Sequence, residues 1–531
     1  MNWRHYSLLF LLSLAVIILV ASFQPASGYM DSDYYFAGGI QLANGHGFTE
    51  PFLWNYLDNP SGLPHPSHSY WMPLASLLAA AGAVLFGPSS WSAARVGFVA
   101  VAASIPPLTA ALAWSFTSRR DLAITSGLLA VFSCFYLPFL PVTDTFGLYM
   151  LFGGLFFLVA NRQLLTANRQ QPISKLKSSI ITPILLGLLA GLMHLSRADG
   201  LLWLLIAFVA ILFQRPSSRS PITFYVSCFA LCLAGYLLIM APWFIRNELT
   251  FGSLLAPGGS KMLWLRYYDQ IFAYPASQLT FSAWWHSGIL AILKARLWAL
   301  GLNLANVLSV QGEIFLLPLI LVGAWHLRKD RRVQLAIFAW GLTLAAMTLA
   351  FPFAGSRGGF FHSGAAVQMM CWVLAPIGLE RFLEWGGRKR GWVLSQAGPI
   401  FRSTLVVLAV LLSATLLYTR LAGGGGGQER RAYIRMDTFL VSKGMLANDI
   451  VVVANPPGFY LASGNPAIAV PDGDASTLLA AARRYGVRYL ILEDGSVPAG
   501  LAPVYENPQG QADWIYLGEV EHARIFQIGQ E

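Results

Sequence analysis

The chain has 531 residues, of which 56% are hydrophobic and only 11% are charged. Soluble domains carry about 25% charged residues, so this composition excludes an ordinary soluble protein and predicts a polytopic membrane protein. The formal net charge is +10, but the basic residues lie in short loops between apolar runs. We therefore interpret the charge as a signal of membrane orientation and expect no nucleic-acid partner.

Apolar runs close to the roughly 20 residues that cross a bilayer recur through most of the chain. The first run could instead be a cleaved signal peptide, because Met1–Tyr6 is short and basic and Ala26–Gly28 is small. The predicted spans, about eleven in all, lie near residues 6–23, 92–116, 121–140, 145–160, 178–193, 200–213, 222–243, 313–327, 333–353, 366–380 and 402–420.

A further apolar segment, Trp71–Phe86, decides the orientation. If it lies in the interface, every basic loop faces the cytoplasm, as the positive-inside rule favours; if it crosses, all of them face outward. Pro73 and the small residues around it also suit a shallow helix. We therefore predict a cytoplasmic N-terminus in the plasma (inner) membrane. The basic loops are 117–121, 161–177, 213–220, 326–332 and 380–391.

The composition changes after the last span. Residues 422–428, AGGGGGQ, predict a flexible linker. Residues 448–464 then indicate a strand and a turn, with the turn at Asn455–Gly458, and residues 474–494 a helix that leads into a second strand. The predicted fold is a mainly α membrane domain over residues 1–421, with interfacial helices in its first outward loop, followed by a small extracytoplasmic α/β domain over residues 429–531.

The first outward loop combines acids, histidines and aromatic rings. Asp31 and Asp33 follow directly on the first apolar run, where helix capping is the simpler interpretation. Aromatic rings beside carboxylates suit a sugar, and a carboxylate can accept a hydroxyl proton as a general base. Carboxylates and histidines can also hold a divalent metal, with Asp31, Asp33, His65 and His68 as candidates. The candidates for binding a sugar or acceptor are Tyr34, Tyr35, His65, His68 and Tyr70.

Several arginines lie in loops predicted to face outward, against the usual charge bias. Guanidinium groups bind phosphate oxygens, so the headgroup of an anionic lipid is one explanation, and snorkelling at the interface is the other. Asp144 is interpreted only as the cap of a span. The candidate phosphate-binding residues are Arg197, Arg246, Arg357 and His362.

These motifs together resemble the integral-membrane glycosyltransferases of superfamily C, in the branch of protein O-mannosyltransferases and the lipid A aminoarabinose transferase. The resemblance covers the layout of about residues 1–420 and is specific mainly in residues 28–121. It rests on a D-x-x-Y-Y loop after the first span, a later G-x-G-F, the run LPHPSHSYWMPL and a basic SRRD turn.

The resemblance implies a hexosyl or pentosyl transferase that moves a sugar from a polyprenyl-phosphate donor to a hydroxyl at the outer membrane face, with inversion. It implies that Asp31 is the base or the acceptor-positioning acid. Protein-mannosylating members have an Asp-Glu pair, whereas here the second acid is displaced to Asp33, which restores the charge or holds a metal. The acceptor, whether protein, lipid or glycan, has no motif.

The alternative function is a transporter or flippase of lipid-linked sugars. Transport pathways usually place ionisable residues inside the membrane and broken helices at matched positions in two halves. The predicted spans hold almost no ionisable residue away from their ends. We therefore favour the transferase.

Overall fold

The structure, a computed structural model, describes residues 1–166, 174–214, 220–422, 427–509 and 514–529. The chain forms two compact units. Unit 1 comprises Met1–Phe23, Gly97–Leu249 and Arg296–Leu421, and unit 2 comprises Gln24–Val96, Thr250–Ala295 and Ala422–Glu531.

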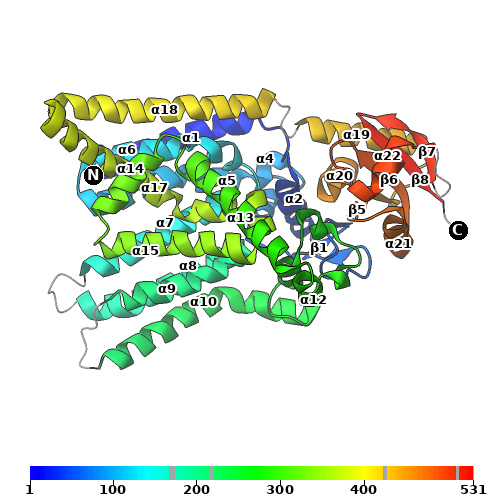
Figure 1. Ribbon diagram of the computed structural model, residues 1–531, viewed down its shortest axis with the longest axis horizontal. Coiled ribbons are helices and arrows are strands. Elements are labelled where there is room, and N and C mark those ends of the chain that lie inside the picture. The colour runs from blue at the N-terminus through cyan, green and yellow to red at the C-terminus, as the bar shows by residue number, and fades with distance from the viewer. Residues whose placement is uncertain (167–173, 215–219, 423–426, 510–513, 530–531) are drawn as a thin grey trace. The chain divides into compact units, whose positions relative to one another are not determined.

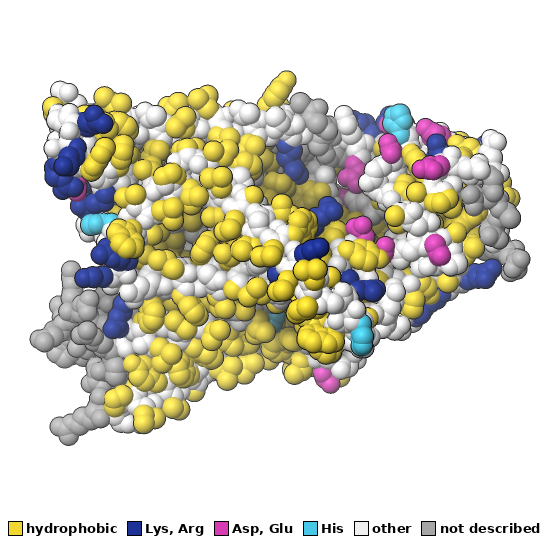
Figure 2. Space-filling view, viewed as in Figure 1, with side chains coloured by type: hydrophobic (Ala, Val, Ile, Leu, Met, Phe, Trp, Pro, Cys, Tyr) yellow, Lys and Arg dark blue, Asp and Glu magenta, His cyan; other side chains and the backbone are white. Residues whose placement is uncertain are grey.

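Unit 1 is a bundle of apolar helices that run side by side (Figure 1). Their surfaces expose large apolar side chains such as Leu238, at 70%, and Trp325, also at 70%. Figure 2 shows such side chains spread over the bundle. The helices, some of which extend a few residues beyond the unit, are α1 (Trp3–Ser22), α5 (Val96–Thr117), α6 (Arg120–Val131), α7 (Phe146–Thr166), α8 (Ser174–Ser196), α9 (Leu202–Leu212), α10 (Pro221–Phe251), α13 (Ile289–Asn306), α14 (Leu317–His326), α15 (Arg331–Ala345), α16 (Pro352–Ala354), α17 (Phe360–Arg390) and α18 (Leu394–Ala422).

Within the described residues, 7 helical segments are long and apolar enough to cross a membrane, and shorter apolar helices lie between them. The mainly helical membrane fold predicted from the sequence is therefore confirmed. One of the seven, Ile289–Gln311, falls in a stretch that we predicted to lie outside the membrane. Lys294 and Arg296 interrupt its apolar run and lower its mean hydropathy to 1.2, which explains why the sequence pattern missed it.

Hydrogen bonds at one end of unit 1 link several of the basic loops. Arg119 bonds to Glu380 at 2.6 Å, and Arg332 donates to the carbonyl of Ser115 at 2.9 Å. Arg331 donates to the carbonyl of Phe213. Figure 2 shows Lys and Arg side chains gathered at this end of the bundle. Loops 117–121, 326–332 and 380–391 thus lie on one side with Phe213, as predicted; residues 167–173 of loop 161–177 lie outside the described residues.

The centre of unit 1 is helix α17, which packs against α14 through glycine. A Cβ atom at Gly378 would lie 1.9 Å from the carbonyl oxygen of Leu319, and one at Gly323 would lie 2.2 Å from that of Leu374. Small residues let membrane helices approach at backbone distance, where dispersion contacts replace the missing hydrophobic effect. The two glycines therefore set the distance between α14 and α17.

Adding a single methyl group at this contact should destabilise the bundle. We expect Gly378→Ala to lower the free energy of unfolding by about 1–3 kcal/mol, the usual cost of overpacking. Thermal unfolding of the purified protein in nanodiscs would measure this loss. Gly341→Ala is the matched control, because a Cβ atom there meets nothing within 4 Å. Equal unfolding midpoints for the two variants would contradict the proposed packing.

Unit 2 combines the first loop with the C-terminal region in one sheet. Its strand order is β2-β5-β4-β6-β8-β7. Strands β2, β5, β4 and β6 are parallel, and β8 pairs antiparallel with β6 and β7. The strands are β1 (Thr49–Glu50), β2 (Phe52–Leu53), β3 (His65–Pro66), β4 (Ile450–Val453), β5 (Ala467–Ala469), β6 (Val487–Glu493), β7 (Trp514–Val520) and β8 (Ala523–Ile528).

The predicted C-terminal α/β structure is confirmed, with one addition. The turn expected at Asn455–Gly458 starts a helix, α20, whose first turn is capped by the side chain of Asn455. The helices of unit 2 are α2 (Met30–Ala43), α3 (Leu74–Phe86), α4 (Trp91–Ala94), α11 (Pro257–Lys261), α12 (Phe281–Trp285), α19 (Gly427–Ser442), α20 (Pro456–Ser463), α21 (Ala475–Tyr485) and α22 (Ala502–Glu506). The predicted linker falls mostly on residues 423–426, outside the described residues.

Helix α3 corresponds to the apolar segment that decided the orientation. It has 13 residues, about 20 Å at 1.5 Å per residue, and is too short to cross a hydrocarbon core of about 30 Å. It packs against α2, where a Cβ atom at Gly39 would lie 2.7 Å from that of Ala79. The structure therefore supports an interfacial helix at this position.

Candidate functional site

The two predicted catalytic acids lie in the first turn of α2. Gly28, with φ +87°, turns the chain just before this helix, and carboxylates at a helix N-terminus are favoured by the helix dipole. Residues two apart in an α-helix point about 200° apart. Asp31 and Asp33 therefore face opposite sides of α2, and Asp31 is partly exposed whereas Asp33 is buried.

Asp33 is held by partners from both ends of the chain. It accepts hydrogen bonds from the Ser27 hydroxyl and from Asn455 Nδ2, the latter at 2.9 Å. The same Nδ2 donates to Glu429 at 2.8 Å, so Asn455 connects the two carboxylates. Burial, aided by the charge of Glu429, raises the pKa of Asp33 from 3.8 to about 7, although the hydrogen bonds and Arg430 favour the ionised form.

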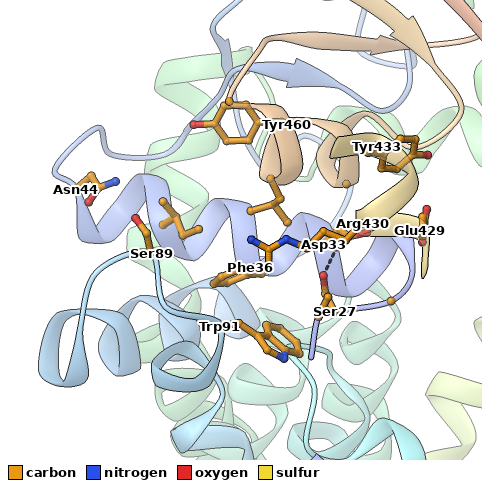
Figure 3. Close-up of a pocket in the computed structure, with 16 residues that line it drawn as sticks. Ser27, Asp33, Phe36, Asn44, Ser89, Trp91, Glu429, Arg430, Tyr433 and Tyr460 are labelled. Atoms are coloured by element: carbon orange, nitrogen blue, oxygen red, sulfur yellow. Dashed lines mark hydrogen bonds between the residues drawn. The ribbon is translucent and has the colours of Figure 1, made fainter. Parts of the chain in front are cut away.

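A cavity of about 370 Å³ opens beside Asp33 within unit 2 (Figure 3). Its walls come from α2, α19, α20 and the segment before α4. They mix carboxylates, a guanidinium, hydroxyls and aromatic rings. The lining residues with polar or aromatic side chains are Ser27, Asp33, Phe36, Asn44, Ser89, Trp91, Glu429, Arg430, Tyr433 and Tyr460.

The tyrosines predicted to bind a sugar are packed inside unit 2. Tyr34 and Tyr35 are each only 2% exposed, and both contact the ring of Trp71. The Tyr34 hydroxyl accepts a hydrogen bond from the backbone N–H of His68 at 2.7 Å. Tyr70, which is partly exposed, lies 4.9 Å from Trp54 between ring centroids. Their role in binding stays a prediction, and in this structure Tyr34 and Tyr35 offer almost no surface to a ligand.

The two histidines of the first loop also have protein partners. His65 Nε2 lies 2.6 Å from Asp58, and His68 bonds to Ser67 at 2.7 Å and to Ser76 at 3.0 Å. Among the residues that the structure describes, neither histidine nor Asp33 belongs to a group of three or more His, Cys, Asp or Glu whose ligand atoms lie within 4.8 Å of one another. These three residues therefore fit a metal poorly.

In unit 1, His362 pairs with Asp144, an acid whose position in the sequence predicted only a helix cap. His362 Nε2 lies 3.2 Å from Asp144 Oδ2, and both side chains are buried. The imidazole stacks on Phe146, and its Nδ1 lies 3.0 Å from the carbonyl of Gly358. Asp144 and His362 lie more than 200 residues apart in sequence, so local patterns could not have paired them.

The three predicted phosphate-binding arginines have different surroundings in unit 1. Arg197 pairs with Asp199 at 2.9 Å. Arg246 lies over the ring of Trp243, 4.8 Å from its centroid. Arg357 is exposed at a kink in the segment Gly355–Gly359, just before α17, where its own backbone is non-helical. Of the three, Arg357 is the most exposed residue.

The membrane-length helical segments make this chain an integral membrane protein, and its fold is similar to those of the solved structures of ArnT and of an archaeal oligosaccharyltransferase. ArnT from Cupriavidus metallidurans, solved bound to undecaprenyl phosphate, is similar over 100% of both chains, with a TM-score of 0.60 and 12% identity.

The archaeal oligosaccharyltransferase AglB from Archaeoglobus fulgidus, in complex with an inhibitory peptide and a dolichol-phosphate, has a TM-score of 0.57 at 12% identity and matches 92% of this chain and 70% of its own. A structure of the Archaeoglobus fulgidus oligosaccharyltransferase with Zn and sulfate has the same TM-score at 14% identity, over 92% of this chain and 67% of its own. No protein-family model matches the sequence, and no curated protein matches it. At these identities the likeness shows the fold, which the loop motifs had predicted.

Proposed function

We propose that this protein transfers a hexosyl or pentosyl group from a polyprenyl-phosphate donor to a hydroxyl acceptor at the outer face of the plasma (inner) membrane, with inversion. The observation that carries the proposal is Asp31, a partly exposed carboxylate at the start of α2 in a chain of this fold. The solved structures of similar fold support it, since one is bound to undecaprenyl phosphate and another to a dolichol-phosphate and a peptide.

In the proposed reaction, Asp31 accepts the proton of the acceptor hydroxyl as its oxygen attacks the anomeric carbon. The bond from that carbon to the phosphate oxygen breaks on the opposite face of the sugar, which inverts the configuration. Negative charge then grows on the lipid phosphate, and positive groups placed there stabilise the transition state. We assign this role first to Arg357, with Arg197 and Arg246 as further candidates.

A divalent metal is compatible with this proposal but not required by it. Carboxylate oxygen and imidazole nitrogen are common ligands of divalent ions, and Asp144 and His362 already hold such atoms 3.2 Å apart. We propose this pair, rather than His65 and His68, as metal ligands. A bound ion would supply positive charge toward the phosphate. Loss of turnover in chelator, restored by one added divalent ion, would support this assignment.

The arginine assignment predicts a specific kinetic defect. We expect Arg357→Ala to raise KM for the donor about 10- to 100-fold, because a charge-assisted hydrogen bond contributes about 1.5–3 kcal/mol. The acceptor KM should change much less. Initial rates at varied donor and acceptor concentrations would measure both. Arg388→Ala, at the basic C-terminal end of α17, is the control, and an unchanged donor KM together with an unchanged kcat in Arg357→Ala would remove this arginine from the site.

Proteoliposomes that contain a labelled polyprenyl-phosphate sugar distinguish the transferase from the alternative transporter. The transferase separates the label from the lipid when acceptor is present. A transporter moves the intact lipid-linked sugar to the other leaflet, where an added impermeant oxidant reaches it. Label that changes leaflet while remaining on its lipid would overturn the proposed function.

A further inference from the structure

The cavity beside Asp33 is separate from the carboxylate that we propose as the base. Asp33, Phe36, Ile40 and Asn44 line it from α2 at spacings of three and four residues, which place them along one face of the helix. Asp31 projects about 200° from Asp33 and is not among the lining residues. The cavity therefore opens on the face of α2 opposite Asp31.

Polar groups converge on the cavity from three elements. Asp33 comes from α2, Glu429 and Arg430 from α19, and Tyr460 from α20. Asn455 fixes the two carboxylates by donating to both, and Gln41 donates to the Tyr460 hydroxyl at 2.8 Å. Figure 3 shows Asp33, Glu429, Arg430 and Tyr460 among the residues that line the cavity. The site therefore offers acceptors and donors at fixed positions, which suit a ligand with several hydroxyl groups.

The apolar part of the lining complements these polar groups. The rings of Phe36 and Trp91 contact each other edge to face, 5.2 Å apart, and Ile40 and Leu461 complete the wall. The indole N–H of Trp91 is bonded to the carbonyl of Gln24, which fixes the ring. A pyranose has an apolar ring face and an edge of hydroxyls. A volume of about 370 Å³ lies within the usual range for small-ligand sites, whereas an extended peptide needs a longer groove.

Close packing around the cavity supports a built site. A Cβ atom at Gly458 would lie 2.9 Å from Asp33 and 2.6 Å from Asn455, so only glycine lets α20 approach α2 this closely. Gly458 also donates its N–H to Asn455 Oδ1 at 3.1 Å. Both polar atoms of the Asn455 side-chain amide, Nδ2 and Oδ1, are thus committed to holding the cavity wall.

We propose that this cavity binds a sugar residue of the acceptor, so that the acceptor is a glycan or the saccharide part of a glycolipid. The identification of the bound saccharide as part of the acceptor rests on the proposed function. The binding of a saccharide in this cavity does not depend on that function. The saccharide held here would anchor the molecule while another of its hydroxyls reaches Asp31 around the start of α2. Such an acceptor must therefore be larger than one sugar residue.

The test is direct binding by the full-length protein in nanodiscs, with no donor present. Saturation-transfer NMR against a panel of soluble mono- and oligosaccharides and hydroxyl-bearing peptides would find ligands, and calorimetry would measure their affinity. We expect an oligosaccharide to bind, and Glu429→Gln and Tyr460→Phe to weaken that binding about 10-fold or more, as expected when a hydrogen bond to the ligand is lost. Arg435→Ala, on the same helix but paired with Glu521, should bind as the wild type does.

Each outcome decides the proposal. Binding of peptides alone, no saccharide binding, or equal affinity in Glu429→Gln and Tyr460→Phe would overturn it, provided that both variants keep the thermal midpoint of the wild type. Because the assay contains no donor, its result is independent of turnover. Donor cleavage without saccharide binding would exclude the proposed saccharide site and leave the proposed transferase activity standing. Saccharide binding without donor cleavage would exclude the transferase activity and leave the saccharide site standing.

Discussion

Replacing Asp31 with asparagine is expected to abolish sugar transfer while leaving the fold intact. A general base typically contributes about 100- to 10,000-fold to a rate, and asparagine cannot accept the proton. Asp31 is partly exposed, so the substitution should disturb packing little. The measurement is the initial rate of sugar transfer in nanodiscs, at saturating donor and acceptor, with thermal unfolding as a check of the fold.

The control is Asp269→Asn, because Asp269 is an exposed acid in the same unit. This variant should transfer sugar at the wild-type rate. If Asp31→Asn kept more than about a tenth of the wild-type rate, the loss would fall below the usual contribution of a base, and Asp31 would be excluded from that role.

Asp33 should make the protein less stable as pH rises, the reverse of a paired surface acid. Its folded pKa of about 7 lies above its ordinary value of 3.8, so the folded state binds its proton more tightly than the unfolded state does. Stability from this group is therefore present below pH 3.8 and is lost as pH rises toward and through 7. The loss is at most about 4 kcal/mol, since each pKa unit corresponds to about 1.4 kcal/mol.

The difference between wild type and Asp33→Asn isolates this contribution. Burial also raises the pKa of Glu493 to about 7, so the wild-type curve alone mixes two groups. We expect the wild-type thermal midpoint to fall more steeply than that of Asp33→Asn between pH 4 and 8. Asp494→Asn, at an exposed position beside Glu493, should follow the wild type. Parallel curves for wild type and Asp33→Asn would show that Asp33 does not carry this shift.

The sequence predicted the elements of this fold whose cause is local. Apolar runs gave most of the membrane helices, and the positive-inside rule placed the basic loops on one side, where Arg119 bonds to Glu380. The helix over residues 475–485 and the strand after it also follow from local pattern, since Asp474 caps the helix and Gly486 ends it. These features depend on residues that are neighbours in the chain.

Long-range pairing set the limit of that prediction. Strand β2 pairs with β5, although the two strands lie more than 400 residues apart in the sequence. The residues Phe52–Leu53 contain no local pattern that predicts this pairing. The sequence predicted only a turn at Asn455, yet its side-chain amide donates hydrogen bonds to both Asp33 and Glu429. The pairing of Asp144 with His362 is of the same kind. Such contacts are fixed by tertiary packing, which one sequence does not encode in any local period.

The sequence could have predicted one more feature of the candidate site, the helix that carries Asp31 and Asp33. The run Met30–Ala43 contains no proline, so a helix could have been predicted directly after Gly28. Helical geometry would then have separated Asp31 from Asp33 and argued against their sharing one metal ion. The burial of Tyr34 and Tyr35 could not be seen in this way, because it depends on contacts with Trp71 and, for Tyr34, with Phe52 in strand β2.

The central claim is that this protein cleaves a sugar from a lipid phosphate, and one measurement tests it most directly. The purified protein in nanodiscs would be given polyprenyl-phosphate sugars one at a time, with a mixture of glycan acceptors, and the free polyprenyl phosphate would be quantified by mass spectrometry. We predict that one donor is consumed and releases its lipid phosphate in proportion to the transferred sugar. If every donor remained intact, with acceptor and divalent ions present, the protein would not be the transferase proposed here.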